Sequence, residues 1–129
     1  MSSANLTLIC VGLGGALGAI LRALTGLLLS KTPVLLGIPL ATLSVNILGS
    51  LLIGIFLTSP QILSHPQLKA FLTAGLMGGL TTFSTFSFDN INLIEHKMLL
   101  QAALNICLNV FLGLGACYLG TLIGRSLNI

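Results

Sequence analysis

Residues 78–87 read GGLTTFSTFS, with two glycines, three threonines, two serines and two phenylalanines inside an otherwise apolar run. Paired glycines and β-branched threonines are poor helix formers. A break here would free backbone carbonyls and amides, which a membrane tolerates only where they face protein, water or an ion. The stretch therefore predicts a membrane-spanning helix that is interrupted near its middle. A kinked helix whose hydroxyls bond back to their own backbone is the alternative.

The composition around this stretch excludes an ordinary soluble domain. The chain has 129 residues, of which 55% are hydrophobic and only 5% are charged, and its mean hydropathy is +1.11. About a quarter of the residues of a soluble domain carry charge. The net charge of +3 is small and spread along the chain, so no basic cluster points to nucleic acid. Lipid is the expected surrounding of most of this chain.

Four apolar runs are each long enough to cross a bilayer, which takes about 20 residues. They cover residues 6–29, 34–57, 68–94 and 98–124, so residues 1–129 form one all-α membrane domain. The first ten residues lack the basic region of a signal peptide, and we expect the first run to stay as a helix. Glycines recur four residues apart in three runs, which favours close helix packing: Gly14 with Gly18, Gly75 with Gly79, and Gly120 with Gly124.

The loop charges give no preferred orientation in the membrane. With the N-terminus in the cytoplasm, Lys69 and Arg125 lie on one side, and Lys31 and Lys97 on the other, with Arg22 near that end of its helix. Such even counts leave the positive-inside rule nothing to act on. We therefore expect insertion in both orientations and an antiparallel homodimer, in which two chains form an inverted repeat.

The polar side chains expected in the membrane interior are amides and hydroxyls, which are neutral. Asn46 lies midway along the second run, and Asn105 and Asn109 lie one helical turn apart on the fourth, on a shared face. Amides bonded to each other between helices would explain them, since a buried amide needs a partner. Amides and hydroxyls also donate hydrogen bonds, and the edge of a phenyl ring is weakly positive, so this set suits a small hydrated anion. Neutral donors allow such an ion to leave again.

Some polar or aromatic residues have simpler explanations. Phe83 and Phe86, at positions i and i+3, also fit a plain packing stripe. The three cysteines lie in apolar runs without metal-like spacing and read as inert thiols, and both histidines lie in short polar segments and read as solvated: Cys10, Cys107, Cys117, His65 and His96.

Three motifs, in order along the chain, resemble those of the Fluc (CrcB-type) fluoride channels. Residues 78–87, GGLTTFSTFS, are similar to the third-helix signature of that family. Residues 14–22, GGALGAILR, resemble its GGxxGAxxR pattern, and residues 42–49, TLSVNILG, its TxxVNxxG pattern. A fourth apolar run follows, so the resemblance covers essentially the whole chain.

The resemblance implies a passive, fluoride-selective channel of the inner (plasma) membrane, and not an enzyme. Implied with it are a dual-topology homodimer with two pores and a central structural sodium ion, bound by the backbone carbonyls of Gly78 and Thr81 from both subunits. Arg22 would stand at an aqueous vestibule, where its charge concentrates anions. The residues implied along the fluoride pathway are Asn46, Phe83, Ser84, Thr85, Phe86, Asn105 and Asn109, of which the last two match the least well conserved helix of the family pattern.

Two other functions fit less of the sequence. A proton-coupled exporter of small drugs or cations also uses four helices and antiparallel dimers, but it needs an intramembrane carboxylate. The first two runs hold none, and Asp89 follows the third-run motif, where it either pairs with Arg22 or stays solvated at a helix end. A non-transporting subunit of a membrane complex would explain the glycine pairs, but not Asn46 or residues 78–87.

Overall fold

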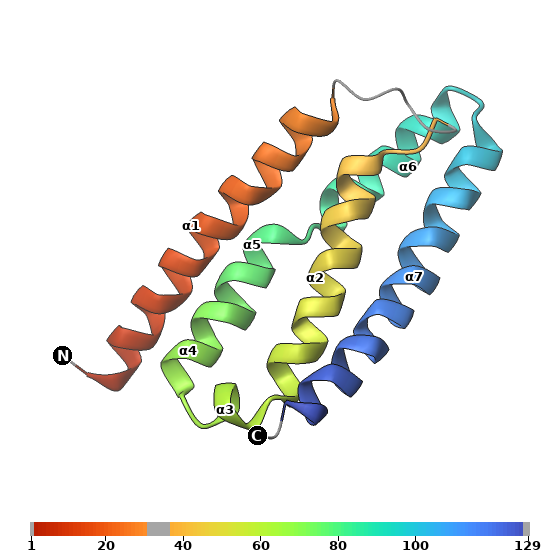
Figure 1. The fold of residues 1–129 in the computed structure, drawn as a ribbon. Coiled ribbons are helices and arrows are strands. Elements are labelled where there is room, and N and C mark those ends of the chain that lie inside the picture. Colours follow the sequence, from red (N-terminus) through yellow and green to blue (C-terminus); the bar gives the residue numbers. More distant parts are fainter. Residues whose placement is uncertain (1, 31–36, 128–129) are drawn as a thin grey trace.

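The computed structural model describes residues 2–30 and 37–127, and all regular elements in these ranges are helical. Three helices are long and apolar enough to cross a membrane: α1 (Ser3–Leu29), α2 (Leu40–Thr58) and α7 (Leu99–Ser126). At 1.5 Å per residue, the 27 residues of α1 extend about 40 Å, which exceeds the roughly 30 Å of a bilayer core. In Figure 1, α2 and α7 lie side by side, and the α4–α5 segment (residues 66–80) lies between α1 and α2.

The chain between α2 and α7 forms a series of shorter helical pieces. The elements are α3 (Pro60–Leu63), α4 (Pro66–Ala70), the π-helix η1 (Phe71–Met77), α5 (Gly78–Leu80) and α6 (Phe83–Glu95). The pieces α4, η1 and α5 follow one another without a gap. Two residues in extended conformation then separate α5 from α6, and α6 continues toward the opposite end of the bundle (Figure 1).

Helix ends follow local chemistry. Ser2 caps α1, since its hydroxyl oxygen accepts from the amide of Asn5 at 3.2 Å. Helix α2 begins at Leu40, whereas the predicted run begins at residue 34. Residues 34–36 of that run lie outside the described residues. Pro39 precedes α2, and a proline disfavours helix in the residue before it. Gly37 also has a positive φ of 77°, so the described residues just before α2 cannot continue a helix.

Glycines allow two pairs of helices to approach closely, as their spacing predicted. A Cβ on Gly14 would collide with the carbonyl of Phe71, and one on Gly18 with the carbonyl of Leu76, so α1 packs directly on η1 and α5. The same holds for α7 on α2, where a Cβ on Gly120 would meet the carbonyl of Leu51. The four-residue glycine repeats are confirmed as packing positions.

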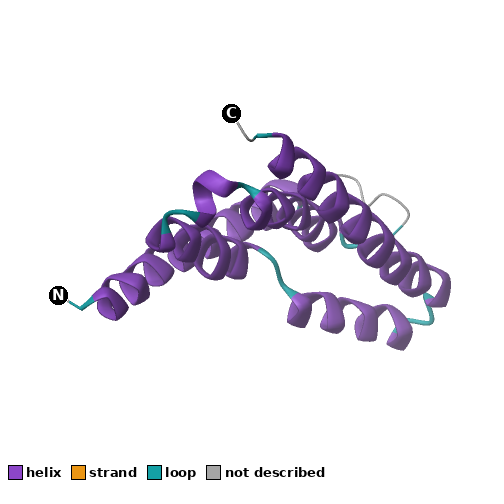
Figure 2. Ribbon diagram, turned by 90° about the horizontal axis from the view of Figure 1, so that it is seen from below, coloured by secondary structure: helices purple, strands orange, loops and turns teal. Residues whose placement is uncertain are grey.

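The two packed pairs lie next to each other, with α1, α5, α2 and α7 following in that order across the view of Figure 1. Seen from below in Figure 2, helices joined by short loops make up the described chain, and the helix after the α5–α6 linker is set to one side. That helix, α6, packs mainly on α7. The core is small and centres on Val45, Met77 and Leu80.

Many large apolar side chains point outward. Leu28 is 72% exposed and Leu8 69%, and further leucines of α1 and α7 are similarly open. Water would not tolerate so large an apolar surface on a single soluble chain. The outer surface of α1 and α7 therefore fits lipid or another protein chain.

The turn between α6 and α7 forms by backbone hydrogen bonds. Lys97 adopts a left-handed φ of 59°, its amide donates to the carbonyl of Ile94 at 2.9 Å, and the amide of Met98 donates to Leu93 at 2.8 Å. This pair of bonds closes the carboxyl end of a helix in the Schellman pattern. The charged residues Glu95, His96 and Lys97 lie at this turn, between the predicted runs 68–94 and 98–124.

Candidate functional site at the α5–α6 break

The break between α5 and α6 is made by Thr81 and Thr82, both in extended conformation. Thr81 still ends the preceding helix, because its amide and its hydroxyl both donate to the carbonyl of Met77, at 3.0 and 2.8 Å. Thr82 starts α6 as its N-cap, since its hydroxyl oxygen accepts from the amide of Thr85 at 3.2 Å. The polar run at 78–87 thus ends one helix and begins another.

The break redirects the groups that would bond along an uninterrupted helix. The carbonyl of Gly78 would accept from the amide of Thr82, but that amide donates to Asn46 Oδ1 at 2.9 Å instead. The carbonyl of Thr81 would accept from the amide of Thr85, which bonds to the Thr82 hydroxyl. Both carbonyl oxygens are thereby released from α-helical bonding, and uncharged oxygens of this kind are suitable ligands for a hard cation.

Asn46 of α2 satisfies both polar groups of Thr82. Its Oδ1 accepts from the Thr82 amide, and its Nδ2 donates to the Thr82 carbonyl at 3.3 Å. A side-chain amide carries a donor and an acceptor side by side, as a peptide group does. Asn46 therefore replaces the missing helical neighbour of Thr82 and stabilises the break.

The amide of Asn46 continues into a chain of asparagines. Its Nδ2 donates to Asn109 Oδ1 at 3.0 Å, and Asn109 Nδ2 donates to both oxygens of Asn105 at 3.0 Å. Asn105 Nδ2 donates to Asn90 Oδ1 at 3.2 Å, and Asn90 Nδ2 to the carbonyl of Phe86 at 2.7 Å. The interhelical amide bonds that the sequence allowed as an alternative are present. The chain joins α2, α6 and α7.

Two residues of this site were missed from the sequence. Asn90 lies four residues after Phe86 on α6 and is 6% exposed, and an amide in an apolar helix was the signal that could have revealed it. Thr82 lies inside the motif but had no role of its own. Its hydroxyl contacts those of Ser84 at 3.2 Å and Thr85 at 3.0 Å, so three hydroxyls cluster at the start of α6.

The two phenylalanines of the motif form a pair. Their ring centroids are 5.5 Å apart and the rings are tilted by 44°. Phe83 is 78% exposed, whereas Phe86 is half-buried. Their position is therefore open on one side in the single chain, and Phe83 does not serve as a core packing residue in the chain itself.

An open groove of about 360 Å³ runs beside the break. Its lining includes Asn46, Ser50, Thr73, Gly78, Thr81 and Phe83. A second hollow of about 380 Å³ shares Ser50 and is bordered by Asn109 and Gly113. The groove therefore brings together the amide of Asn46, the two residues whose carbonyls lack α-helical bonds (Gly78 and Thr81) and the phenyl ring of Phe83. None of the groove-lining residues is charged.

Arg22 lies in a different hollow, of about 360 Å³, between α1, α2 and the start of α6. Thr82 borders this hollow as well as the groove. Arg22 Nη1 lies 3.5 Å from the carbonyl oxygen of Thr81, at the outer limit of a hydrogen bond. The guanidinium is half-buried and is directed at the break.

Asp89 bonds to a hydroxyl. Thr42 Oγ1 donates to Asp89 Oδ2 at 2.7 Å, which joins α2 to α6. Neither of the two roles considered for Asp89 is seen. Arg22 approaches the Thr81 carbonyl and not Asp89. The Asp89 side chain is half-buried and bonded to Thr42, so it is not a solvated carboxylate at a helix end. Among residues 2–30 and 37–127, no three His, Cys, Asp or Glu side chains are grouped to hold a metal.

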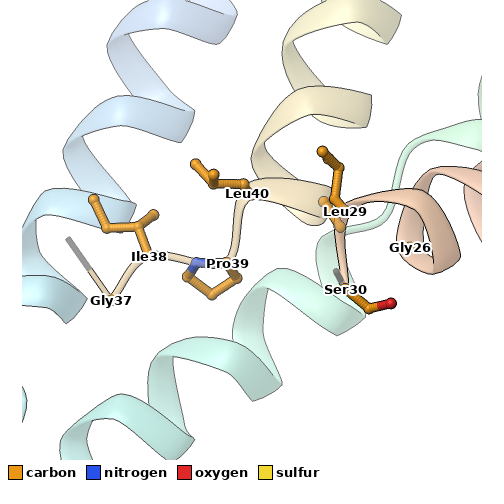
Figure 3. Close-up of a pocket in the computed structure, with 8 residues that line it drawn as sticks. Gly26, Leu29, Ser30, Gly37, Ile38, Pro39 and Leu40 are labelled. Carbon is orange, nitrogen blue, oxygen red and sulfur yellow. The ribbon is translucent and has the colours of Figure 1, made fainter. Parts of the chain in front are cut away.

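A further pocket, drawn in Figure 3, lies where α1 ends and α2 begins. Its volume is about 350 Å³, and Gly26, Ser30, Ile38 and Pro39 are among its lining residues. The Ser30 hydroxyl donates to the carbonyl of Leu27 at 2.8 Å. This pocket holds none of the residues predicted for the site.

Comparison with known proteins identifies the family. Residues 9–121 match the family model described as "CrcB-like protein, Camphor Resistance (CrcB)". The chain belongs to the CrcB-like family. Its similar relatives include proteins named fluoride-specific ion channel FluC. The one from Campylobacter fetus is 47% identical over 115 residues, which cover 88% of this chain and 90% of that protein.

Two further relatives carry the same name. The protein from Methanococcus maripaludis is 46% identical and covers 89% of this chain and 93% of its own length. The one from Flavobacterium psychrophilum is 46% identical and covers 94% of this chain and 98% of its own. The resemblance expected from the three motifs is confirmed. With its membrane-length helices, this CrcB-like protein is a multi-pass protein of the inner membrane.

Proposed function

We propose that this CrcB-like protein is a passive channel that lets fluoride leave the cell. The observation that carries the proposal is the 46–47% identity, over 88–94% of the chain, to proteins named fluoride-specific ion channels. An ion channel is not an enzyme class. The site fits this function, because the groove beside the break holds amide, hydroxyl, backbone and phenyl groups and no charged side chain.

The fluoride pathway in this proposal follows the α5–α6 break. Asn46 offers an amide, Phe83 and Phe86 offer ring edges, and Ser84 and Thr85 offer hydroxyls. The bond of Asn46 Nδ2 to the Thr82 carbonyl, at 3.3 Å, is the longest of its bonds. An anion that enters the groove would take over that hydrogen at the lowest cost, and the amide would return to the carbonyl when the ion leaves.

Arg22 serves in this proposal as an attractor of anions. Its guanidinium lies in a hollow next to the groove, and the two hollows share Thr82. A charge beside the path raises the local concentration of fluoride without binding it directly. A charge inside the groove would hold the anion too tightly for rapid release.

We further propose the working unit to be an antiparallel, dual-topology homodimer with two pores, in which the predicted third span, residues 68–94, is broken near mid-membrane. Lys69 of α4 and Arg125 of α7 stand at one end of the bundle, and Lys97 at the other, so the described charges give weak orientation. Lys31 lies outside the described residues. The exposure of Phe83 and of the grooves supports a partner at this face.

A structural sodium ion at the dimer centre completes the proposal. The carbonyls of Gly78 and Thr81 would hold it, and the break suits them, since the amides of their helical partners bond elsewhere. A bound cation would supply positive charge where two breaks meet. The approach of Arg22 Nη1 to the Thr81 carbonyl means that the guanidinium and a cation would share this oxygen.

Ion efflux from liposomes tests the function. Purified protein is reconstituted, the vesicles are loaded with fluoride in one batch and chloride in another, and the external anion is followed after a potassium ionophore is added. Rapid fluoride efflux with little chloride efflux is expected. Absence of fluoride efflux from folded protein would contradict the proposal. Proton-coupled cation export, which the relatives do not favour, would then be tested with a pH gradient.

A further inference from the structure

The strongest feature not explained by the pathway is the complete burial of Asn105. Its side chain is 0% exposed, and no other large side chain among the described residues is buried as fully. A pathway residue would need to meet the ion. The residues that line the groove beside Asn46 come from α2, η1, α5, the break and the start of α6, and Asn105 of α7 is not among them.

Asn105 instead connects two neighbours that belong to different parts of the site. Its Nδ2 donates to Asn90 Oδ1 at 3.2 Å, and its Oδ1 accepts from Asn109 Nδ2 at 3.0 Å. Asn90 in turn is tied to the carbonyl of Phe86, and Asn109 to the amide of Asn46. Asn105 is thus the middle of a relay, defined here as Asn90, Asn105, Asn109 and Asn46.

Backbone groups fix the direction of three of the four amides in the relay, those of Asn90, Asn109 and Asn46. A carbonyl can only accept and a backbone N–H can only donate. The carbonyl of Phe86 requires the Nδ2 of Asn90, and the carbonyl of Asn105 requires the Nδ2 of Asn109. The amide of Thr82 requires the Oδ1 of Asn46.

Asn105 is then oriented by its neighbours, since Asn90 presents an oxygen and Asn109 a nitrogen. Rotating any one amide by half a turn would place two donors or two acceptors together. Only one arrangement pairs all four side chains. In that arrangement the Nδ2 of Asn46 lies toward the Thr82 carbonyl and Asn109, as a donor.

We propose that Asn105 is a positioning residue of the fluoride pathway, which couples the placement of α6 and its Phe86, through Asn109, to the position of the Asn46 amide. Asn90 is a second member of the same device. The inference rests on the proposed function for its effect on fluoride, but the coupling itself is a property of the four amides. It separates Asn105 from the residues that meet the ion.

Side-chain NMR and flux together test the coupling. The chain has seven asparagines, so protein labelled with ¹⁵N-asparagine gives few side-chain signals. The signal of Asn46 is the one that disappears in the Asn46→Asp variant, because a carboxylate has no NH₂ group. The variants are Asn105→Leu, Asn90→Leu and the double variant, with Asn92→Leu as control. Asn92 lies on α6 outside the relay, and Leu approximates the shape of Asn.

In Asn105→Leu we expect the Asn46 signal to shift without fluoride present, and fluoride flux to fall by about tenfold, as for a small misplacement of a binding group. The Asn92→Leu control should change neither. The double variant leaves no orphaned amide between α6 and α7, so it keeps the fold if the single variants lose it. It should still show the shifted signal and the reduced flux.

The outcomes separate the two proposals. The double variant could show the same Asn46 signal and the same flux as the Asn92→Leu control. That result would mean that Asn105 only fills space, and it would overturn the inference. Reduced thermal stability with an unchanged signal and flux would overturn it as well. A wild-type protein that passes no fluoride would overturn the proposed function, whereas the signal shift is measured without fluoride.

Discussion

The side-chain amide of Asn46 pairs with both backbone polar groups of Thr82, accepting from its N–H at 2.9 Å and donating to its carbonyl at 3.3 Å. A residue of α2 thereby supplies the acceptor that the Gly78 carbonyl, in the preceding turn, would offer to the Thr82 amide in an unbroken helix. The same amide borders the groove. The stability of the break and, in the proposed pathway, the donor offered to fluoride therefore depend on one side chain.

Replacing Asn46 by Asp separates these two roles. The carboxylate can still accept from the Thr82 amide, but it cannot donate to Asn109 or to an anion, and it adds negative charge beside the path. We expect fluoride efflux from liposomes to fall at least about tenfold, the factor for 1.4 kcal/mol. Asn92→Asp on α6 is the control for the added charge. Undiminished flux in Asn46→Asp would remove Asn46 from the pathway.

Replacing Phe83 or Phe86 by Ile keeps apolar bulk and removes the electropositive ring edge. We expect each variant to lower fluoride flux several-fold while its size-exclusion profile stays that of the unaltered protein. Phe88→Ile is the matched control, because Phe88 lies on the same helix, is 65% exposed and does not line the groove. Equal flux in all three variants would reduce the pair to packing residues.

Gly18→Ala tests the contact between α1 and the η1–α5 segment. The added Cβ would meet backbone atoms of Leu76, Gly79 and Leu80, which cannot move aside as a side chain could. Overpacking of this kind costs about 1–3 kcal/mol, so the midpoint of thermal unfolding in detergent should fall. Gly12→Ala, on the same helix with nothing within 4 Å, should leave it unchanged or higher. A Gly18→Ala variant as stable as Gly12→Ala would contradict the close approach.

Lys97→Gly should stabilise the turn between α6 and α7. Lys97 has a φ of 59°, a conformation that glycine adopts without steric cost and other residues adopt at a cost of roughly 1 kcal/mol. We expect the free energy of unfolding to rise by about 0.5–1 kcal/mol, and the midpoint of thermal unfolding to rise with it. Lys69→Gly, inside the last turn of α4, is a contrasting variant that should destabilise. A lower midpoint for Lys97→Gly would refute the assignment of strain.

The dual topology of the proposed dimer is tested by tags. A C-terminal tag is detected with a reagent that does not cross the membrane, first in intact and then in permeabilised cells. The tag should be found on both sides of the membrane in comparable amounts. Adding two lysines beside Arg125, at one end of the bundle, should shift the distribution to one side and reduce the number of functional dimers. A tag on a single side in the unaltered chain would exclude the antiparallel arrangement.

Much of the fold could be predicted because it depends on local sequence. The helices α1 and α7 follow from apolar runs longer than the bilayer is thick, and the turn at Lys97 from a charged tripeptide between two such runs. The glycine repeats gave the contact faces, since only residues without a side chain allow backbones to approach this closely. The predicted start of the second helix, at residue 34, was less accurate than these, because the apolar run continues through Pro39 whereas α2 begins at Leu40.

The candidate site could be predicted by residue type but not by connection. Asn46, Asn105 and Asn109 stood out because amides are rare in apolar helices, yet their spacing did not reveal that Asn105 would be fully buried and bonded to Asn90. Asp89 bonds to Thr42, a partner 47 positions away. Such pairings depend on how α6 lies against α2 and α7.

The order of residues alone is enough to predict a helical membrane protein, an interruption at residues 78–87 and a set of neutral donors. Composition and helix propensity act on each segment separately, and they are enough for these conclusions. The tertiary structure alone decided that Asn46 bonds to Thr82, that four asparagines form one directed chain, and that Arg22 reaches the carbonyl of Thr81. Hydrogen bonds between segments require distances and angles that exist only once the helices have packed, because each donor must meet one acceptor in space.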